Sequence, residues 1–236
     1  MTRHFGVLIP STNTTVEIEY TRLLPPKWQA HYARILSQTH GASPFSPPLD
    51  GDVEYQSRLL ATARVELIIL VQTSASLFAD DWDDTTIARI EQASGVKAII
   101  SANAVGEAAR ALGAQQVALV SPYSEEVNAR ARHYFEGKHG LKVAALEGFA
   151  AKDSYMIGKL GPENARDAFR RIDRPEIEAF IVPGGNFPTM ASIPEWEREF
   201  GKPVVTTNQA ALWAMMRALG STVPLPGLGR LLELVA

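Results

Sequence analysis

An internal repeat constrains the fold of this chain more than any other feature of its sequence. Three segments resemble three later ones in the same order: 7–17 and 118–128, 66–76 and 178–188, and 99–113 and 204–220. The offsets are 111, 112 and 105 to 107 residues. A nearly constant offset indicates two structural units of similar topology, rather than the general likeness between any two α/β segments.

Short apolar segments alternate with helical patterns along the chain. Several of these segments are continuously apolar, as in strands that are covered on both faces of a sheet. The predicted strands are residues 4–10, 29–36, 66–72, 96–101, 116–121, 142–149, 178–183 and 202–207. The predicted helices are residues 52–65, 103–113, 124–138, 161–172 and 208–220. This alternation predicts an α/β protein with parallel sheets.

The repeat and the alternation together predict two pseudo-symmetric α/β halves, each with a parallel sheet of the Rossmann-like or flavodoxin-like kind. We assign residues 1–114 and 208–236 to the first half and residues 115–207 to the second. Ligands bind beyond the carboxyl ends of the strands in such sheets. Two facing halves would therefore enclose one ligand between equivalent strand ends, with Gln72 opposite Gly184.

The composition limits the available chemistry and the classes of partner. The chain has no cysteine, which excludes disulfides, thiolate metal ligands and thiol catalysis. Its five histidines lack metal-site spacing, so we predict neither a metal nor a cofactor. A net charge of -3 offers no basic excess for nucleic acid or a membrane surface. The first residues are too polar for a secretory signal, and no apolar run approaches the about 20 residues of a membrane span, so we predict a cytoplasmic protein.

Small hydrogen-bonding residues follow four of the predicted strands. They are Ser11 and Asn13, Thr73 and Ser74, Tyr123, and Gly185 and Asn186. Converging neutral donors suit an anionic oxygen, and glycine lets backbone N–H groups approach closely. The same residues also suit plain structural roles, because serine and threonine at strand ends cap helices and Gly-Gly-Asn forms turns.

Five stretches of the chain carry a family resemblance: 6–20, 71–76, 120–128, 153–169 and 182–189. They resemble the aspartate/glutamate racemase superfamily and, within it, the maleate cis-trans isomerases and arylmalonate decarboxylases. The resemblance spans nearly the whole chain. It implies that Asn13 binds a substrate carboxylate and that Tyr123 belongs to the site. It also implies a small carboxylate or dicarboxylate ligand and a homodimer or homotetramer.

The chain departs from this family at both strand ends that carry its chemistry. The racemases and maleate isomerases have a cysteine at each end, and the decarboxylases at the second, where this chain has Gln72 and Gly184. Thiol mechanisms are therefore excluded. Gln72 does not titrate but can donate and accept hydrogen bonds, and Gly184 offers only backbone. Tyr123 is the predicted acid or base, with Asp153 or a water as alternatives, although a tyrosine pKa of about 10 would need tuning.

Two functions of different classes remain open. The first is an enzyme that acts at the carbon next to the carboxylate, as an isomerase or decarboxylase-type lyase, by non-thiol chemistry in an oxyanion-stabilising pocket. Tyr123, Gln72 and Gly184 would be its catalytic positions. The second is a non-catalytic carboxylate-binding or regulatory protein on the same scaffold. A solute-binding protein of the periplasmic type also has two α/β halves, but would normally carry a signal segment. The proline-rich segment 40–52 is predicted to be a loop that could cover the pocket.

Overall fold

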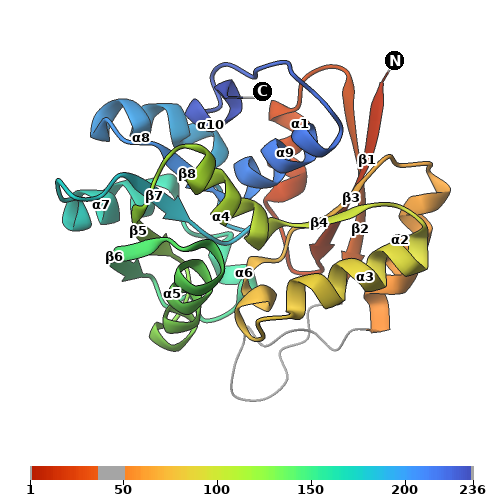
Figure 1. Ribbon diagram of the computed structural model, residues 1–236, viewed down its shortest axis with the longest axis horizontal. Helices are drawn as coiled ribbons and strands as arrows, with labels where there is room; N and C mark the ends of the chain where they lie inside the picture. Colours follow the sequence, from red (N-terminus) through yellow and green to blue (C-terminus); the bar gives the residue numbers. More distant parts are fainter. Residues whose placement is uncertain (1, 37–50, 235–236) are drawn as a thin grey trace.

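The computed structural model describes residues 2–36 and 51–234. They form two four-stranded parallel sheets with helices on their faces (Figure 1), which confirms the predicted fold class. The strand order is β2-β1-β3-β4 in the first sheet and β6-β5-β7-β8 in the second. The two sheets therefore share one topology.

Every predicted strand is present, with small differences in its ends. The first sheet contains β1 (Arg3–Pro10), β2 (Trp28–Ile35), β3 (Ile68–Leu70) and β4 (Ala98–Ile100). The second contains β5 (Gln116–Ser121), β6 (Lys142–Gly148), β7 (Ala179–Val182) and β8 (Val204–Thr206). The register repeats as well, because Gly6 pairs with Ile68 and Val117 pairs with Ala179, each 111 positions later. The exact boundaries of the two halves, 1–114 with 208–236 and 115–207, stay a prediction.

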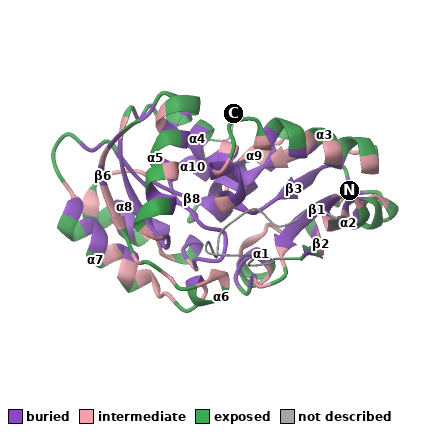
Figure 2. Ribbon diagram, turned by 90° about the horizontal axis from the view of Figure 1, so that it is seen from below, coloured by how far each residue is buried: buried purple, intermediate pink, exposed green. Residues whose placement is uncertain are grey.

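Helices connect the strands and include all five that the sequence predicts. The helices are α1 (Val16–Leu23), α2 (Gly51–Thr62), α3 (Trp82–Ser94), α4 (Ser101–Ala111), α5 (Glu125–His139), α6 (Ser154–Ile157), α7 (Pro162–Ile172), α8 (Ile193–Phe200), α9 (Thr207–Ala218) and α10 (Arg230–Glu233), with the 3-10 helices η1 (Thr73–Leu77) and η2 (Met190–Ser192). Ser124 caps α5, because its side chain accepts a hydrogen bond from the backbone N–H of Val127. Figure 2 shows that the strands are largely buried, whereas the outer helix faces are exposed.

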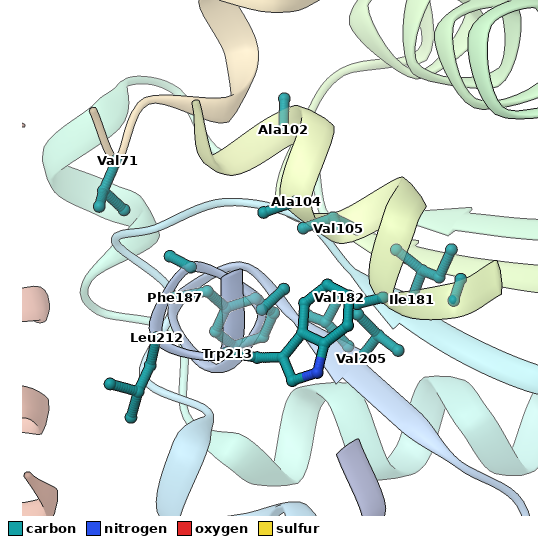
Figure 3. Close-up of a cluster of buried hydrophobic side chains, with 14 of the residues drawn as sticks. Val71, Ala102, Ala104, Val105, Ile181, Val182, Phe187, Val205, Leu212 and Trp213 are labelled. Carbon is teal, nitrogen blue, oxygen red and sulfur yellow. The ribbon is translucent and has the colours of Figure 1, made fainter. Parts of the chain in front are cut away.

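Helices α4 and α9 lie between the two sheets and pack against each other (Figure 1). Each begins directly after the last strand of its own sheet. Figure 3 shows the apolar cluster to which they belong, with Val71 of the first half, Ala104 and Val105 of α4, Val182 of the second half and Trp213 of α9 among its members. Because side chains from both halves share this cluster, its burial holds the two sheets at a fixed relative position.

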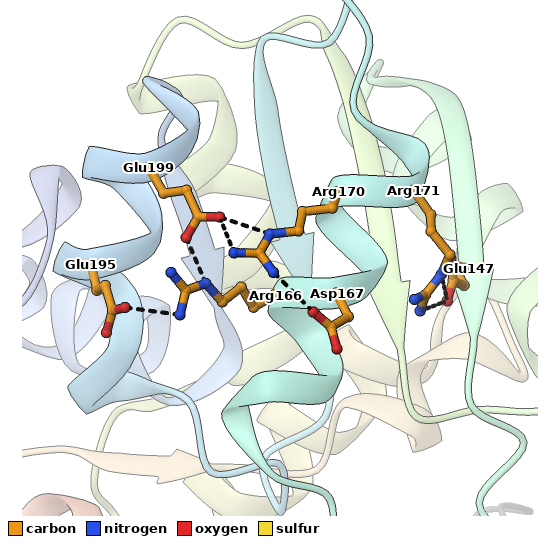
Figure 4. A network of polar contacts seen from close by, with 7 residues as sticks. All are labelled: Glu147, Arg166, Asp167, Arg170, Arg171, Glu195 and Glu199. Carbon is orange, nitrogen blue, oxygen red and sulfur yellow. Dashed lines mark hydrogen bonds and ion pairs between the residues drawn. The ribbon is translucent and has the colours of Figure 1, made fainter.

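Ion pairs on the second half lie on its outer surface (Figure 4). Arg166 of α7 contacts Glu195 and Glu199 of α8, and Arg170 also contacts Glu199. The side chain of Arg171 pairs with Glu147 of β6. Such exposed pairs contribute at most about 1 kcal/mol each, so they orient α7 and α8 but do not determine the fold.

Two predictions concern features away from this core. Among residues 2–36 and 51–234, no helix has the length and apolarity needed to cross a bilayer. Most of the predicted loop at 40–52 lies outside the described residues, and its last two residues begin α2. Its proposed role as a cover for a pocket therefore stays a prediction.

Candidate functional site

A small pocket lies at the carboxyl ends of strands from both sheets. We call it the strand-end pocket. Its walls follow β1, β3, β5 and β7 and include part of α6: Pro10, Thr12, Asn13, Val71, Gln72, Thr73, Ser74, Tyr123, Ser154, Ile157, Gly184, Gly185 and Asn186. Eight of the nine predicted site residues are among them, including the repeat-related pair Gln72 and Gly184. Their roles stay predictions.

Ser11 is the predicted site residue that does not line this pocket. It lies just beyond β1 and is exposed to solvent. Its backbone N–H donates to the carbonyl of Ile35 (2.8 Å), and its carbonyl accepts from Arg34 Nη1 (3.0 Å). These bonds hold Ser11 at the edge beside β2, so that Thr12 and Asn13 turn toward the pocket instead.

Asn13 has a side chain whose orientation is fixed by the start of α1. Its Oδ1 accepts hydrogen bonds from the backbone N–H groups of Thr15 and Val16, both at 3.0 Å. The oxygen is therefore occupied, and the Nδ2 group remains as the donor of this buried side chain. A fixed amide donor at the pocket suits a ligand oxygen.

Gln72 and Thr12 each bring an unmet hydrogen-bonding atom to the pocket. Gln72 follows β3 and is only 8% exposed. Its Oε1 and the Oγ1 of Thr12 are buried, and neither has a hydrogen-bond partner among the residues that the structure describes. Buried polar atoms in folded proteins are almost always paired. These two atoms therefore mark positions where a bound molecule would make polar contacts.

A chain of hydroxyl groups links the two halves across the floor of the site. The side chain of Tyr123 is hydrogen-bonded to Thr73, whose Oγ1 lies 3.0 Å from Thr207 Oγ1 at the start of α9. The same Thr207 oxygen accepts from the backbone N–H of Gly184 at 2.9 Å. These bonds fix the phenol and the Gly184 backbone relative to each other.

The environment of Tyr123 determines its protonation state. It is 2% exposed, and burial raises its pKa well above the usual tyrosine range, while the hydrogen bond from Thr73 offsets a part of that effect. The phenol therefore stays neutral at physiological pH and can donate a hydrogen bond. A raised pKa runs against the predicted use of Tyr123 as a base.

Backbone geometry explains the two adjacent glycines in the pocket wall. Gly184 has φ +111°, a conformation that side-chain-bearing residues rarely adopt, and an added Cβ would lie 3.0 Å from Pro122 Cγ. At Gly185 an added Cβ would lie 2.6 Å from Val71 Cγ1, across the junction of the two halves. Glycine here allows the second half to approach the end of β3 closely.

Asn186 uses its polar atoms within the protein. Its Oδ1 accepts from the backbone N–H of Thr14 (2.7 Å), and its Nδ2 donates to the carbonyl of Ser154 (2.7 Å). Its own carbonyl accepts from Thr15 Oγ1 at 2.8 Å. The predicted substrate-binding residue therefore joins the second half to the start of α1 and to α6.

Glu19 is a functional candidate that the sequence did not reveal. This buried carboxylate of α1 accepts hydrogen bonds from the backbone N–H groups of Thr189 (2.7 Å) and Met190 (2.8 Å) and from Asn208 Nδ2 (2.6 Å). Asn208 Nδ2 also donates to the carbonyl of Gly185 at 3.1 Å. Burial raises the pKa of Glu19, and the three hydrogen bonds oppose that effect. Glu19 thus holds the loop after β7 from the opposite half.

Neutral groups make up the described walls of the pocket. No lysine, arginine, histidine, aspartate or glutamate is among its described lining residues. Asp153, an alternative acid or base, instead caps α6, because its Oδ1 accepts from the backbone N–H of Met156 at 2.8 Å. Within the described parts of the chain, no cluster of three or more histidine, aspartate or glutamate side chains could hold a metal ion. The site can bind an anion through neutral hydrogen bonds.

Comparison with known proteins connects this geometry to a family. A family model described as arylmalonate decarboxylase matches residues 6–232. A maleate isomerase of Nocardia farcinica is 28% identical over 241 residues, which cover 98% of this chain and 96% of the relative. An arylmalonate decarboxylase of Bordetella bronchiseptica is 27% identical over 186 residues, 75% of each protein.

Solved structures of such proteins have the same fold as this chain. The maleate cis-trans isomerase of Nocardia farcinica, in a variant with a covalently bound succinylcysteine intermediate, matches with a TM-score of 0.89 at 27% identity over 99% of both chains. A maleate isomerase of Pseudomonas putida S16, solved with maleate, matches with a TM-score of 0.90 at 23% identity over 99% of this chain and 98% of that one. The second likeness concerns the fold alone.

Proposed function

The chain belongs to the arylmalonate decarboxylase family, and from that premise we propose that its strand-end pocket binds a small carboxylate or dicarboxylate and acts at the adjacent carbon. One observation carries the proposal: neutral hydrogen-bonding groups from four strand ends and both halves converge on one small, largely buried pocket. Such groups suit the oxygens of a carboxylate, whose negative charge they stabilise without a counter-ion. The relatives include the maleate isomerase of Nocardia farcinica, 28% identical to this chain, which supports a ligand of this class.

The proposed holding groups are the Asn13 amide, the Thr12 hydroxyl and the backbone around Gly185. The Asn13 donor is preorganised because its oxygen is already bonded to the start of α1. A preorganised donor aimed at developing negative charge contributes about 3 kcal/mol to catalysis in other enzymes. Several of them would stabilise a carboxylate that takes up charge from its neighbouring carbon.

The proposed chemistry involves no thiol, in contrast to the relative with the succinylcysteine intermediate. When a bond at the carbon next to the carboxylate breaks, the electron pair moves into the carboxylate, where the neutral donors stabilise it. A water or the neutral Tyr123 phenol would return the proton. Gln72 and Gly184 would flank the reacting carbon. A decarboxylase-type lyase fits this description directly, because carbon dioxide leaves without its electron pair and only a proton has to be returned. An isomerase that breaks a C–H bond would also need a water to accept the proton.

A non-catalytic carboxylate-binding or regulatory protein is the second candidate. The specific observation in its favour is that the described walls offer no side chain that titrates near neutral pH. Such a pocket binds an anion readily but has little capacity to move protons. Homodimer or homotetramer formation and a cytoplasmic location stay predictions for either candidate.

Ligand binding and turnover can be separated by experiment. Thermal unfolding is measured with maleate, malonates, aspartate and glutamate, and each stabilising acid is then followed by NMR in deuterated water. Deuterium incorporation at carbon, isomer formation or release of carbon dioxide supports the enzyme. Saturable binding without any of these supports the binding protein. The absence of stabilisation by every carboxylate would refute both.

A matched pair of variants links any binding to this pocket. Thr73→Val removes the hydroxyl that joins Tyr123 and Thr207, and we expect affinity for the acid to fall about tenfold, because the phenol and the Gly184 backbone lose the hydrogen bonds that position them. Thr62→Val removes an exposed hydroxyl on α2 that bonds only locally to the carbonyl of Leu59. That control should leave affinity unchanged.

A further inference from the structure

Gln72 has the clearest unmet hydrogen-bonding demand in the strand-end pocket. Its side chain is more than nine-tenths buried, and its Oε1 is inaccessible to solvent. No residue that the structure describes donates to this oxygen. A buried amide oxygen without a donor is costly, so a protein that retains one at a pocket gains most when a ligand supplies the donor.

The neighbouring donors are already committed or occupy other positions. The Thr73 hydroxyl is shared between Tyr123 and Thr207. The N–H of Gly184, the residue opposite Gln72 in the repeat, donates to Thr207. No cationic side chain is among the described lining residues. Since no described residue donates to Gln72 Oε1, this oxygen is open to a donor on the bound molecule.

We infer that the strand-end pocket selects a carboxylate whose second polar group is a neutral hydrogen-bond donor, such as a carboxamide or a hydroxyl, and that Gln72 Oε1 accepts from this group. The inference depends on the proposed function only in that the pocket binds a carboxylate. It narrows the substrate class, because a plain dicarboxylate would place an acceptor against an acceptor.

The electrostatics of the pocket also favour a ligand with one carboxylate and one neutral donor over a dicarboxylate. The neutral donors around Asn13 can stabilise one carboxylate. A second carboxylate at Gln72 would meet the negative end of the amide dipole and would lose its hydration without a cation to replace it. A carboxamide has almost the same shape, carries no charge and presents N–H groups to Oε1. A rotated Gln72 amide would instead present its NH₂ group, which is the arrangement that a dicarboxylate requires.

Isosteric ligand pairs distinguish these arrangements. Calorimetry compares maleamate with maleate, and malonamate with malonate, on the full-length protein. We expect the half-amide of at least one pair to bind about tenfold more tightly than its diacid, since a site built around a hydrogen bond rejects analogues that leave it unpaired. Gln72→Leu should weaken the half-amide about tenfold and abolish that preference. The control Gln92→Leu, on the exposed face of α3, should leave both affinities unchanged.

A second variant guards against misfolding of Gln72→Leu. Gln72→Glu keeps the acceptor and removes the NH₂ group, so at pH 8 it should still bind the half-amide and reject the diacid more strongly. Equal or tighter binding of the diacids by the unaltered protein would overturn the inference while leaving the proposed function intact. A half-amide preference that persists in Gln72→Leu would also overturn it. If none of the four acids binds, the inference fails, and the proposed function fails with it only if aspartate, glutamate and the other malonates also do not bind.

Discussion

The two halves of the molecule share a strand order and a register, yet they contribute different chemistry to the strand-end pocket. The first half supplies polar side chains, and both unmet lining atoms, Thr12 Oγ1 and Gln72 Oε1, belong to it. The second half supplies backbone at Gly184 and Gly185 and the neutral phenol of Tyr123. The repeat is therefore a symmetry of the backbone, while the chemistry of the site is asymmetric.

The contacts between the halves show the same division. Glu19 of α1 holds the loop after β7, and Asn186 of that loop reaches back to Thr14 and to Ser154. The polar side chains of the second-half loop thus serve to attach it, whereas those of the first half remain available to a ligand. We infer that the first half recognises the ligand and that the second half closes the pocket over it.

Replacement of Glu19 should have the largest effect on stability, because it removes the hydrogen bonds that attach the loop after β7 to α1. Glu19→Leu leaves two buried backbone N–H groups and the Asn208 amide without their acceptor, and we expect a loss of at least about 3 kcal/mol in the free energy of unfolding. Urea unfolding measures it. Glu19→Gln keeps an acceptor for the backbone and should lose less. Equal stability of Glu19→Leu and the unaltered protein would show that the loop is held by other contacts.

The substitution of asparagine by aspartate, made at Asn13 in the first half and at Asn186 in the second, tests the difference between the halves. Asn13→Asp keeps the oxygen that bonds to the start of α1, so stability should change by less than about 1 kcal/mol. It replaces the Nδ2 donor by negative charge, so carboxylate affinity should fall about 100-fold.

Asn186→Asp is the counterpart of that variant in the second half. It loses the donation to Ser154, which should cost about 2 kcal/mol in stability. Carboxylate affinity should fall much less than in Asn13→Asp, because Asn186 uses its amide within the protein. Calorimetry and urea unfolding of both variants test this reversal, and similar profiles for the two would refute the division between the halves.

Cysteine substitutions at the two matching strand ends should also differ. Gly184→Cys forces a side chain onto φ +111° and close to Pro122, so we expect a stability loss of about 1–3 kcal/mol. Gln72→Cys removes an unpartnered amide and should change stability by less than about 1 kcal/mol. Thermal unfolding compares them. Maleate isomerisation by the double variant would show that the scaffold otherwise supports thiol chemistry, and equal stabilities would contradict the strain at Gly184.

The sequence was a good guide to the sheets because their signals are local. Short apolar segments predicted all eight strands, and the nearly constant offset of the repeat located Gln72 and Gly184 at matching strand ends. Helices α1, α3 and α8 and the four-residue helices α6 and α10 were not among the five predicted helices. Helices α1 and α8 are each eight residues long and mix charged with apolar positions, so their burial depends on neighbours from elsewhere in the chain.

The hydrogen bonds that join the two halves at Glu19 and Asn186 could not be predicted from the sequence, for a related reason. The partners of Glu19 lie at least 170 positions away, and nothing in the local pattern distinguishes this glutamate from Glu17, which is only half-buried. Asn186 was predicted as a ligand contact because it is a hydrogen-bonding residue that follows a predicted strand. Only the fold shows that Thr14 and Ser154 occupy its hydrogen-bonding atoms.

The smallest effect is expected from pH, and it tests the part that the second half plays through Tyr123. A neutral phenol donates to a bound carboxylate, whereas a phenolate would repel it, so affinity should fall as pH rises through the pKa of Tyr123. Burial raises that pKa above its usual range of about 10. Carboxylate affinity should therefore stay constant between pH 7 and pH 10.

The variant Tyr123→Phe is the control, and it should bind about tenfold more weakly at every pH in that range. If affinity of the unaltered protein falls between pH 8 and pH 10 while that of Tyr123→Phe stays flat, the tyrosine titrates in the working range, and the second half contributes an acid or base rather than a fixed donor.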